Sequence, residues 1–356
     1  MSIVIAIIIF GVIVIIHEFG HYWTARKCGI LVEEFAIGMG PKLFSFTRGD
    51  TLYSIRALPI GGYCRMLGDS STDDDPRAFN NKHLLKRVAV ISAGAVVNIL
   101  FSLVVFTGLV MFSGYNSLEV RDVIAGSPAQ QAGFMVGDRV RSVDGRSVHL
   151  VEDLSFKLMD YDGKSPLDIG LYRNGTVIHK TLIPMKQESG DYILGINPMP
   201  KTGCFQAGVA GIPRAGVLEC AAAGVWKFSS FIYMTVYGIF KLVTLHLPMS
   251  DLSGPIGIVN VIGTVYQQNI VYGILSAITS MVALAGMLSA ALGVFNLIPL
   301  PALDGGRLVF LIIEAVRGKP VKPEREGAVH LVGFVLLMIL AVFVAYNDVL
   351  KIFSGH

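Results

Sequence analysis

The sequence predicts a polytopic α-helical membrane protein with about four transmembrane helices, a membrane-associated β-hairpin region and one inserted extracytoplasmic α+β domain. Two observations lead to this fold class. Of the 356 residues, 53% are hydrophobic and only 15% are charged, whereas soluble globular chains carry about 25% charged residues. In addition, apolar stretches long enough to cross a bilayer, which takes roughly 20 residues, alternate with stretches in which charges return.

Four stretches have the length and apolarity of a transmembrane helix. They are residues 1–23, 88–112, 272–295 and 331–350. The third stretch continues to residue 317 through a segment in which two prolines, Pro299 and Pro301, must break the helix. At membrane depth, a broken helix is tolerated only where it lines a cavity or is buried in protein. We therefore expect the break to line a cavity or to lie buried in protein.

The stretches between the spans differ in character. Residues 24–87 are expected to form a membrane-associated β region and loop on the cytoplasmic side. Within them, residues 31–66 contain several glycines and a turn signal at Arg48–Asp50, so they predict strands and hairpins, whereas 69–76 predict a polar loop. Residues 201–271 form a connecting region, in which 226–247 predicts an amphipathic helix at the membrane interface. Lysine and arginine gather between spans one and two and between spans three and four. Positively charged loops stay in the cytoplasm, which places residues 115–200 outside.

Several other classes of protein are excluded. The net charge of +3, without a basic stripe, gives no indication of a nucleic-acid partner. The four cysteines are scattered and form no C-x-x-C pair, which argues against a disulfide framework or a cysteine-based zinc site. The first span lacks a basic leading region and is long enough to cross, so we expect it to be retained rather than cleaved as a signal peptide.

Ionisable residues near the end of the first span form an H-E-x-x-H motif, made of His17, Glu18 and His21. Residues i and i+4 share one face of a helix, so both imidazoles can bind one metal ion. Glu18 can take the proton of the water that attacks a substrate. The alternative is a polar patch at a helix end, which the rarity and functional bias of ionisable residues inside membranes disfavour.

The third metal ligand is expected to be Asp304. Catalytic zinc sites commonly have three protein ligands and one open position. Glu33 and Glu34 lie in the β-prone region, whereas Asp304 follows the broken third span, at the same predicted depth as His17. The alternative is that Asp304 is the N-cap of a helix over residues 305–316. The sequence alone does not decide between the two.

Residues 115–200 have the character of a separate soluble domain. Four groups of small and charged residues are spaced as in a PDZ domain: Gly126–Ala129, Ala132–Gly133, Gly137–Val140 and Val143–Gly145. The stretch 151–161 predicts the helix of this domain. Because the second span leads into it with almost no linker, we expect the domain to lie close to the membrane.

Two motifs in this order, H-E-F-G-H at 17–21 and N-L-I-P-L-P-A-L-D-G-G at 296–306, resemble those of bacterial site-2 proteases. The resemblance is to the RseP type of these enzymes, which are intramembrane zinc metalloproteases of the M50 family. Other segments resemble this family's β region, its second span and the stretch before its third span: Phe35–Leu43, Gly61–Met66, Arg87 with Ser92–Asn98, and Ser253–Gly257. The chain departs from the family in having Ala95 where proline is usual, and one PDZ-like domain where some relatives have two.

The resemblance implies roles for the site residues. His17, His21 and Asp304 would bind Zn²⁺, and Glu18 would be the general base. Asn296 would engage the substrate backbone.

Two asparagines, Asn98 and Asn296, lie in or next to the apolar spans. A side-chain amide at Asn296 can donate to a developing oxyanion. Alternatively, it satisfies carbonyls freed by Pro299 or Pro301. We expect Asn98 to make an ordinary interhelical hydrogen bond and leave it outside the site.

The implied reaction is peptide-bond hydrolysis inside the transmembrane segment of a single-span protein, in regulated intramembrane proteolysis at the bacterial inner membrane. The implied partners are the lipid bilayer and already trimmed substrates, such as anti-sigma factors or signal-peptide remnants. One rival is a membrane metal transporter, which would need more intramembrane ligands. Another is an inactive scaffold, which would not need Glu18. The PDZ-like domain would either obstruct untrimmed substrates or capture a new C-terminus.

Overall fold

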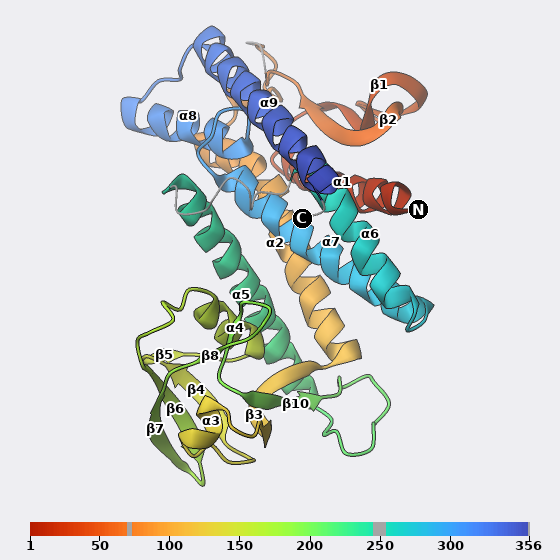
Figure 1. Cartoon of the computed structure of the whole chain (residues 1–356). Coiled ribbons are helices and arrows are strands. Elements are labelled where there is room, and N and C mark those ends of the chain that lie inside the picture. The colour runs from red at the N-terminus through yellow and green to blue at the C-terminus, as the bar shows by residue number, and fades with distance from the viewer. Residues whose placement is uncertain (70–72, 245–253, 355–356) are drawn as a thin grey trace. The chain divides into compact units, whose positions relative to one another are not determined.

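Figure 1 shows the computed structural model of the chain, which describes residues 1–69, 73–244 and 254–354. The chain divides into two compact units, Met1–Ser102 together with Thr235–His356, and Leu103–Met234. Two helices run from one unit into the other: α2 (Leu84–Ser113) and α5 (Val217–Val243). The second unit therefore contains the whole region predicted as an inserted domain, together with parts of these two helices.

The first unit is mainly helical. Besides its parts of α2 and α5, it contains α1 (Ser2–Lys27), the short 3₁₀ helix η1 (Phe79–Asn81), α6 (Pro255–Ile270), α7 (Ile274–Leu297), α8 (Asp304–Arg317) and α9 (Pro323–Ser354). Helix α1 contacts α6 and α7, and α6 also contacts α7 and α9. The break after α7 falls at Pro299 and Pro301, as predicted.

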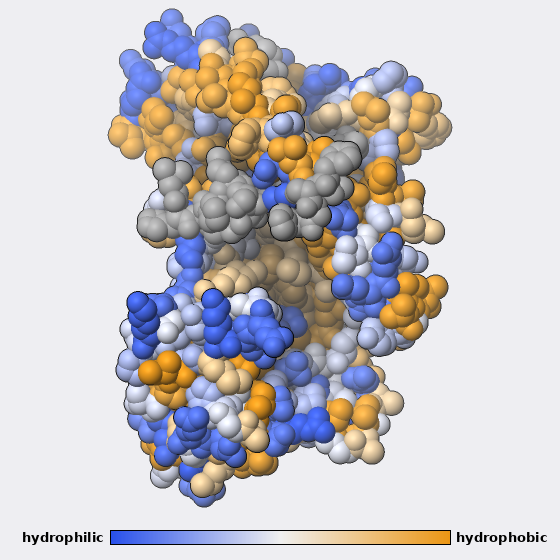
Figure 2. Space-filling model, viewed as in Figure 1, coloured by the Kyte–Doolittle hydropathy of each residue, from blue (hydrophilic) through white to orange (hydrophobic). Residues whose placement is uncertain are grey.

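Four helices among the described residues are long and apolar enough to cross a membrane: α1, α2, α7 and α9. This confirms the predicted number of spans. Hydrophobic side chains gather over α9 in Figure 2, and Phe334, Leu336 and Ile339 on this helix are more than half exposed. A surface of this kind fits contact with lipid.

The connecting region contains more helix than the sequence predicted. Helix α5 begins at Val217, earlier than expected, and is not among the helices that qualify as spans. Helix α6 was not predicted at all, although Pro255 at its first position is a common start signal. The end of the predicted amphipathic helix, 245–247, and Ser253 of the family-like segment lie outside the described residues.

A charged residue within α9 joins this helix to the start of α6. Asp348 is only 3% exposed. Its carboxylate accepts hydrogen bonds from the backbone N–H groups of Gly254, at 3.0 Å, and Gly257, at 2.8 Å. The N–H groups at the start of a helix have no partners within the helix, so Asp348 caps α6 from a distant part of the chain.

The β-prone region of the first unit forms a curved sheet from two long strands, β1 (Val32–Arg48) and β2 (Thr51–Met66). The turn falls at Gly49, whose φ of 62° favours glycine. The predicted hairpin is thus confirmed. Near the turn, residues 44–48 pair with 51–55, and at the far end residues 32–37 pair with 62–66. No other described strand pairs with residues 62–66.

The second unit is built on a six-stranded sheet with the order β10-β3-β4-β6-β7, in which β5 also pairs with β4. The strands are β3 (Tyr115–Val123), β4 (Arg139–Val143), β5 (Arg146–Ser147), β6 (Leu167–Arg173), β7 (Thr176–Leu182) and β10 (Ile196–Lys201). A separate pair is formed by β8 (Met185–Lys186) and β9 (Tyr192–Ile193). The helices α3 (Pro128–Gln131) and α4 (Val151–Met159) complete it, and α4 confirms the helix predicted over 151–161.

This unit has a hydrophobic core of its own. Val120, Ile169 and Leu171 are fully buried within it. Asp138, which is 1% exposed, pairs with Arg173 at 2.6 Å, so its buried charge is compensated. A cavity of about 580 Å³ lies between α4 and the segment from β9 into β10, which forms one edge of the sheet.

Candidate metal centre and active site

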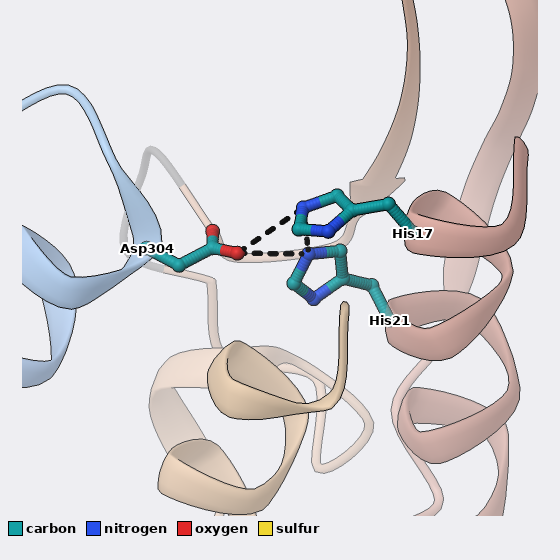
Figure 3. Close-up of side chains that lie close together, drawn as sticks. All are labelled: His17, His21 and Asp304. Carbon is teal, nitrogen blue, oxygen red and sulfur yellow. Dashed lines mark hydrogen bonds and ion pairs between the residues drawn. The ribbon is translucent and has the colours of Figure 1, made fainter. Parts of the chain in front are cut away.

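The two histidines of the H-E-x-x-H motif point the same way from α1, as Figure 3 shows. Their rings are 8% and 7% exposed for His17 and His21, and the Nε2 atoms lie 3.2 Å apart. The separation of four residues produces this geometry, because it puts both side chains on one face of the helix. The pair is therefore a preformed two-nitrogen site.

Asp304 completes a three-ligand cluster. Its Oδ2 atom lies 3.2 Å from Nε2 of His17 and 3.3 Å from Nε2 of His21. These three ligand atoms lie within 4.8 Å of one another. Asp304 is the first residue of α8, the N-cap position belongs to Leu303, and no side-chain cap bond forms. The N-cap alternative for Asp304 is therefore wrong, because the carboxylate faces the histidines.

The donor set fits a zinc ion. Two imidazole nitrogens and one carboxylate oxygen are the ligands of many catalytic zinc sites, which keep a fourth position open. Oδ2 of Asp304 is buried and has no hydrogen-bond partner among the described residues. An unpaired carboxylate oxygen that faces two ring nitrogens is costly to bury, and a metal ion shared by the three atoms removes this cost.

The turn that leads into α8 sets the position of Asp304. Ala302 adopts a φ of 73°, which is unfavourable for a residue other than glycine, and its N–H donates to Nδ1 of His330 at 2.8 Å. A Cβ atom on Gly305 would lie 2.1 Å from the Ile298 carbonyl oxygen. The turn is therefore tight, and only glycine fits at residue 305.

Helix α8 is also held by two ion pairs. Arg307, one turn after Asp304, pairs with Asp69 beyond the end of β2. Arg87 at the start of α2 pairs with Glu314 near the end of α8. Both pairs connect α8 to segments that are distant in sequence, so they restrict how far Asp304 can move.

Helix α2 packs closely behind the histidines. A Cβ atom on Gly94 would lie 2.4 Å from Nε2 of His21 and 2.7 Å from Cε1 of His17. On α1, a Cβ atom on Gly20 would lie 2.6 Å from the Ala93 carbonyl oxygen. Small residues allow membrane helices to approach closely, and here the approach makes room for the metal ligands.

Both histidines have a neighbour at their second ring nitrogen. Nδ1 of His21 lies 2.8 Å from the Val90 carbonyl oxygen. Nδ1 of His17 lies 3.5 Å from the side-chain amide of Asn98, which is fully buried. From the sequence, Asn98 was expected to make only an ordinary interhelical hydrogen bond outside the site. A polar residue in the middle of an apolar span was the signal for it.

Glu18 lies between the histidines in sequence and beside β2 in space. A Cβ atom on Gly62 would be 3.4 Å from Cγ of Glu18 and 2.9 Å from the Ala36 carbonyl oxygen. Residues 62–66 pair with β1 along one edge, and Gly62 at the start of this segment lies next to Glu18.

Asn296 does not belong to the three-ligand cluster. Its amide donates to the carbonyl oxygen of Leu292, one turn earlier in α7, at 3.0 Å. The prolines at 299 and 301 would free the carbonyls of Phe295 and Leu297, so the bond to Leu292 is not the repair considered from the sequence.

A charged network lies within the hairpin. Glu34 is 1% exposed, and its Oε1 accepts from Ser54 and from Arg56, each at 2.7 Å. Burial alone raises the pKa of Glu34, but hydrogen bonds from Ser54, Arg56 and Tyr63 outweigh it and lower the pKa to about 2. The carboxylate is thus charged at neutral pH and ties neighbouring parts of the sheet together.

Comparison with known proteins finds relatives that match nearly the whole chain. A model of peptidase family M50 matches residues 5–340. A putative zinc metalloprotease of Clostridium acetobutylicum is 38% identical over 352 residues, which cover 98% of this chain and 97% of that protein. The zinc metalloprotease RasP of Shouchella clausii is 33% identical over 437 aligned residues, which cover 98% of each.

Proposed function

This chain belongs to peptidase family M50 and is a membrane zinc metalloprotease of the site-2 type, and from that premise we propose that it hydrolyses peptide bonds inside the transmembrane segments of single-span proteins. The observation that carries the proposal is the meeting of His17, His21 and Asp304 on helices that belong to or adjoin predicted spans. A site so placed reaches substrates that are themselves in the bilayer.

His17, His21 and Asp304 are the residues that would hold the zinc ion. When bound, zinc supplies Lewis acidity, which polarises a carbonyl group and makes water more acidic. Glu18 takes the proton from the attacking water and delivers it to the nitrogen of the leaving amine. Neither task of Glu18 is needed in a structural zinc site, so its presence supports catalysis over an inactive scaffold.

The substrate must unwind before it is cut, because a helix engages its carbonyl groups in bonds between residues i and i−4. An added strand is a common way to bind an extended peptide. Residues 62–66 pair with β1 on one side only, their other edge has no partner among the described strands, and Gly62 lies next to Glu18. We therefore assign this edge as the place where the unwound substrate pairs, and Asn296 as a donor to its backbone.

The sheet domain of the second unit is assigned as the PDZ domain expected from its sequence spacing. Its cavity of about 580 Å³ lies between a helix and an edge strand, which is the arrangement that binds a peptide by strand addition. Two roles are open to it, namely obstruction of untrimmed substrates and capture of a trimmed C-terminus. The proposed location is the bacterial inner membrane, with this domain outside and the metal centre near the cytoplasmic side.

The test uses purified protein in detergent or lipid and a peptide that contains one transmembrane segment. Cleavage that stops with a zinc chelator and returns with added zinc is the expected result. Asp304→Ala should bind less zinc and cut more slowly. A metal transporter or a scaffold would leave the peptide intact, and intact peptide with fully zinc-loaded protein would contradict the proposal.

A further inference from the structure

The hydrogen bond at one ring nitrogen of a histidine decides whether the other nitrogen can bind a metal ion. A neutral imidazole carries its proton on either Nδ1 or Nε2, and only the unprotonated nitrogen has a lone pair for the metal. In both histidines of the cluster it is Nε2 that faces Asp304. Both must therefore carry the proton on Nδ1 and need an acceptor there.

His21 has such an acceptor. Its Nδ1 lies 2.8 Å from the backbone carbonyl oxygen of Val90. A carbonyl can only accept, so this contact fixes the proton on Nδ1 and leaves Nε2 free. Histidine ligands of metal ions usually have a partner of this kind, and it fixes both the tautomer and the ring orientation.

Among the described residues, the hydrogen-bonding neighbour of Nδ1 of His17 is Asn98. The amide nitrogen Nδ2 of Asn98 lies 3.5 Å from Nδ1 of His17, so in this orientation a donor faces an atom that must itself donate. Meanwhile Oδ1 of Asn98 is buried and has no partner among the described residues. A half-turn of the amide about its Cβ–Cγ bond exchanges the two atoms, which have nearly the same shape.

We propose that Asn98 is a positioning residue for the zinc site, whose Oδ1 accepts a hydrogen bond from Nδ1–H of His17. This inference rests on the proposed zinc site. It goes beyond the three ligands because it gives a role to Asn98, which is not itself a ligand and was expected from the sequence to lie outside the site. The exchange turns an opposed pair of donors into a hydrogen bond at a fully buried position, where an unmatched polar contact is unfavourable.

Helix α7 packs against the backbone and Cβ of Asn98. The hydroxyl of Ser289 on α7 donates to the Asn98 backbone carbonyl at 3.1 Å. A Cβ atom on Gly293 would lie 3.4 Å from Cβ of Asn98. Ser102, one turn further along α2, has a buried Oγ without a partner among the described residues, and it lies on the face from which it can accept the displaced amide N–H.

The test measures zinc affinity by competition with a chelator, with no substrate present. Asn98→Leu has no acceptor and should weaken zinc binding about 10- to 100-fold. Asn98→Asp keeps the shape and can only accept, so its affinity should stay within threefold of the wild type or be tighter. Gly108→Ala is the control on the same helix, because no atom lies within 4 Å of an added Cβ there, and it should leave affinity unchanged.

The aspartate variant keeps the inference testable even where the leucine variant fails to fold. If Asn98→Asp loses more than threefold in affinity, the amide nitrogen rather than the oxygen is needed, and the inference is overturned. Unchanged affinity in a folded Asn98→Leu would overturn it as well. Failure of the wild-type protein to bind zinc is a different result, since it would contradict the proposed function itself.

Discussion

Gly94 shows how strongly one small residue on a neighbouring helix controls the metal ligands. A Cβ atom there would lie 2.4 Å from Nε2 of His21 and 2.7 Å from Cε1 of His17, closer than van der Waals contact allows. The site thus requires a residue without a Cβ atom at position 94 of α2, as well as the two histidines of α1. The H-E-x-x-H motif alone does not reveal this dependence.

Gly94→Ala should lower zinc affinity at least tenfold, because a Cβ at 2.4 Å from Nε2 of His21 forces the ring away. Gly108→Ala is the control on the same helix, where no atom lies within 4 Å of an added Cβ. Zinc content after dialysis against a weak chelator measures both. Equal zinc content in the two variants would show that the rings have more room than the structure gives them.

Glu18→Gln separates proton transfer from metal binding. Glutamine keeps the size of glutamate but cannot accept the proton, so turnover should fall by about 10²–10⁴-fold while zinc content stays near the wild-type value. The matched measurements are metal analysis and peptide cleavage on the same preparation. Unchanged cleavage with full zinc content would remove Glu18 from its assigned role.

The sequence predicted the residues of the site unequally. His17 and His21 could be paired from their spacing, because a helix fixes which residues share a face. Asp304 could be proposed but not distinguished from an N-cap, since its partners lie on a helix at the other end of the chain. Asn98 could not be assigned, because its contact with His17 depends on how α1 and α2 pack.

At the level of elements, the spans were predictable and the connections were not. Long apolar runs identify α1, α2, α7 and α9 directly, whatever their packing. Helix α6 is shorter, and it was read as part of a connection. The hairpin was predicted from its turn and β-prone residues, but its register, which brings Gly62 beside Glu18, depends on the bends between residues 37 and 44.

The buried carboxylate of Glu34 makes the hairpin sensitive to acid. Its folded-state pKa of about 2 lies below the ordinary value of 4.5. The stabilisation is therefore complete above pH 4.5 and is lost as the pH falls towards 2. Zinc-free protein should unfold at progressively lower temperature over this range, and the zinc-free form is used because zinc also dissociates in acid.

Glu34→Gln should remove most of this pH dependence, since glutamine does not titrate. Glu33→Gln is the control, because Glu33 is more exposed and its side chain pairs with Arg65 at the surface. The two variants are compared by thermal unfolding between pH 6 and pH 3. An unfolding temperature of Glu34→Gln that falls with acid as steeply as that of the wild type would contradict the assignment.

The chain combines a mainly helical unit, which carries the three-ligand cluster, with a sheet domain that has its own core. We favour obstruction of untrimmed substrates as the role of this domain, because its short connection to α2 restricts its reach. Removing residues 115–200 and joining the ends with a flexible linker should then allow untrimmed substrates to be cut.

Capture of a new C-terminus makes the opposite prediction for this deletion. Trimmed substrates would be cut more slowly, and untrimmed ones would gain nothing. One substrate in a long and a short form, tested with the intact and the deleted enzyme, distinguishes the two roles. A deleted enzyme that stays folded, cuts the short form and still rejects the long form would exclude obstruction.

We propose that this chain hydrolyses a peptide bond within a transmembrane segment at its zinc centre. Its most direct test is mass spectrometry of the products formed from a single-span substrate in ¹⁸O-labelled water. We expect one new carboxyl terminus that carries the label and lies inside the apolar segment. This product should be absent with Glu18→Gln. Labelled termini found only in the flanking soluble segments, or formed equally by Glu18→Gln, would contradict the proposal.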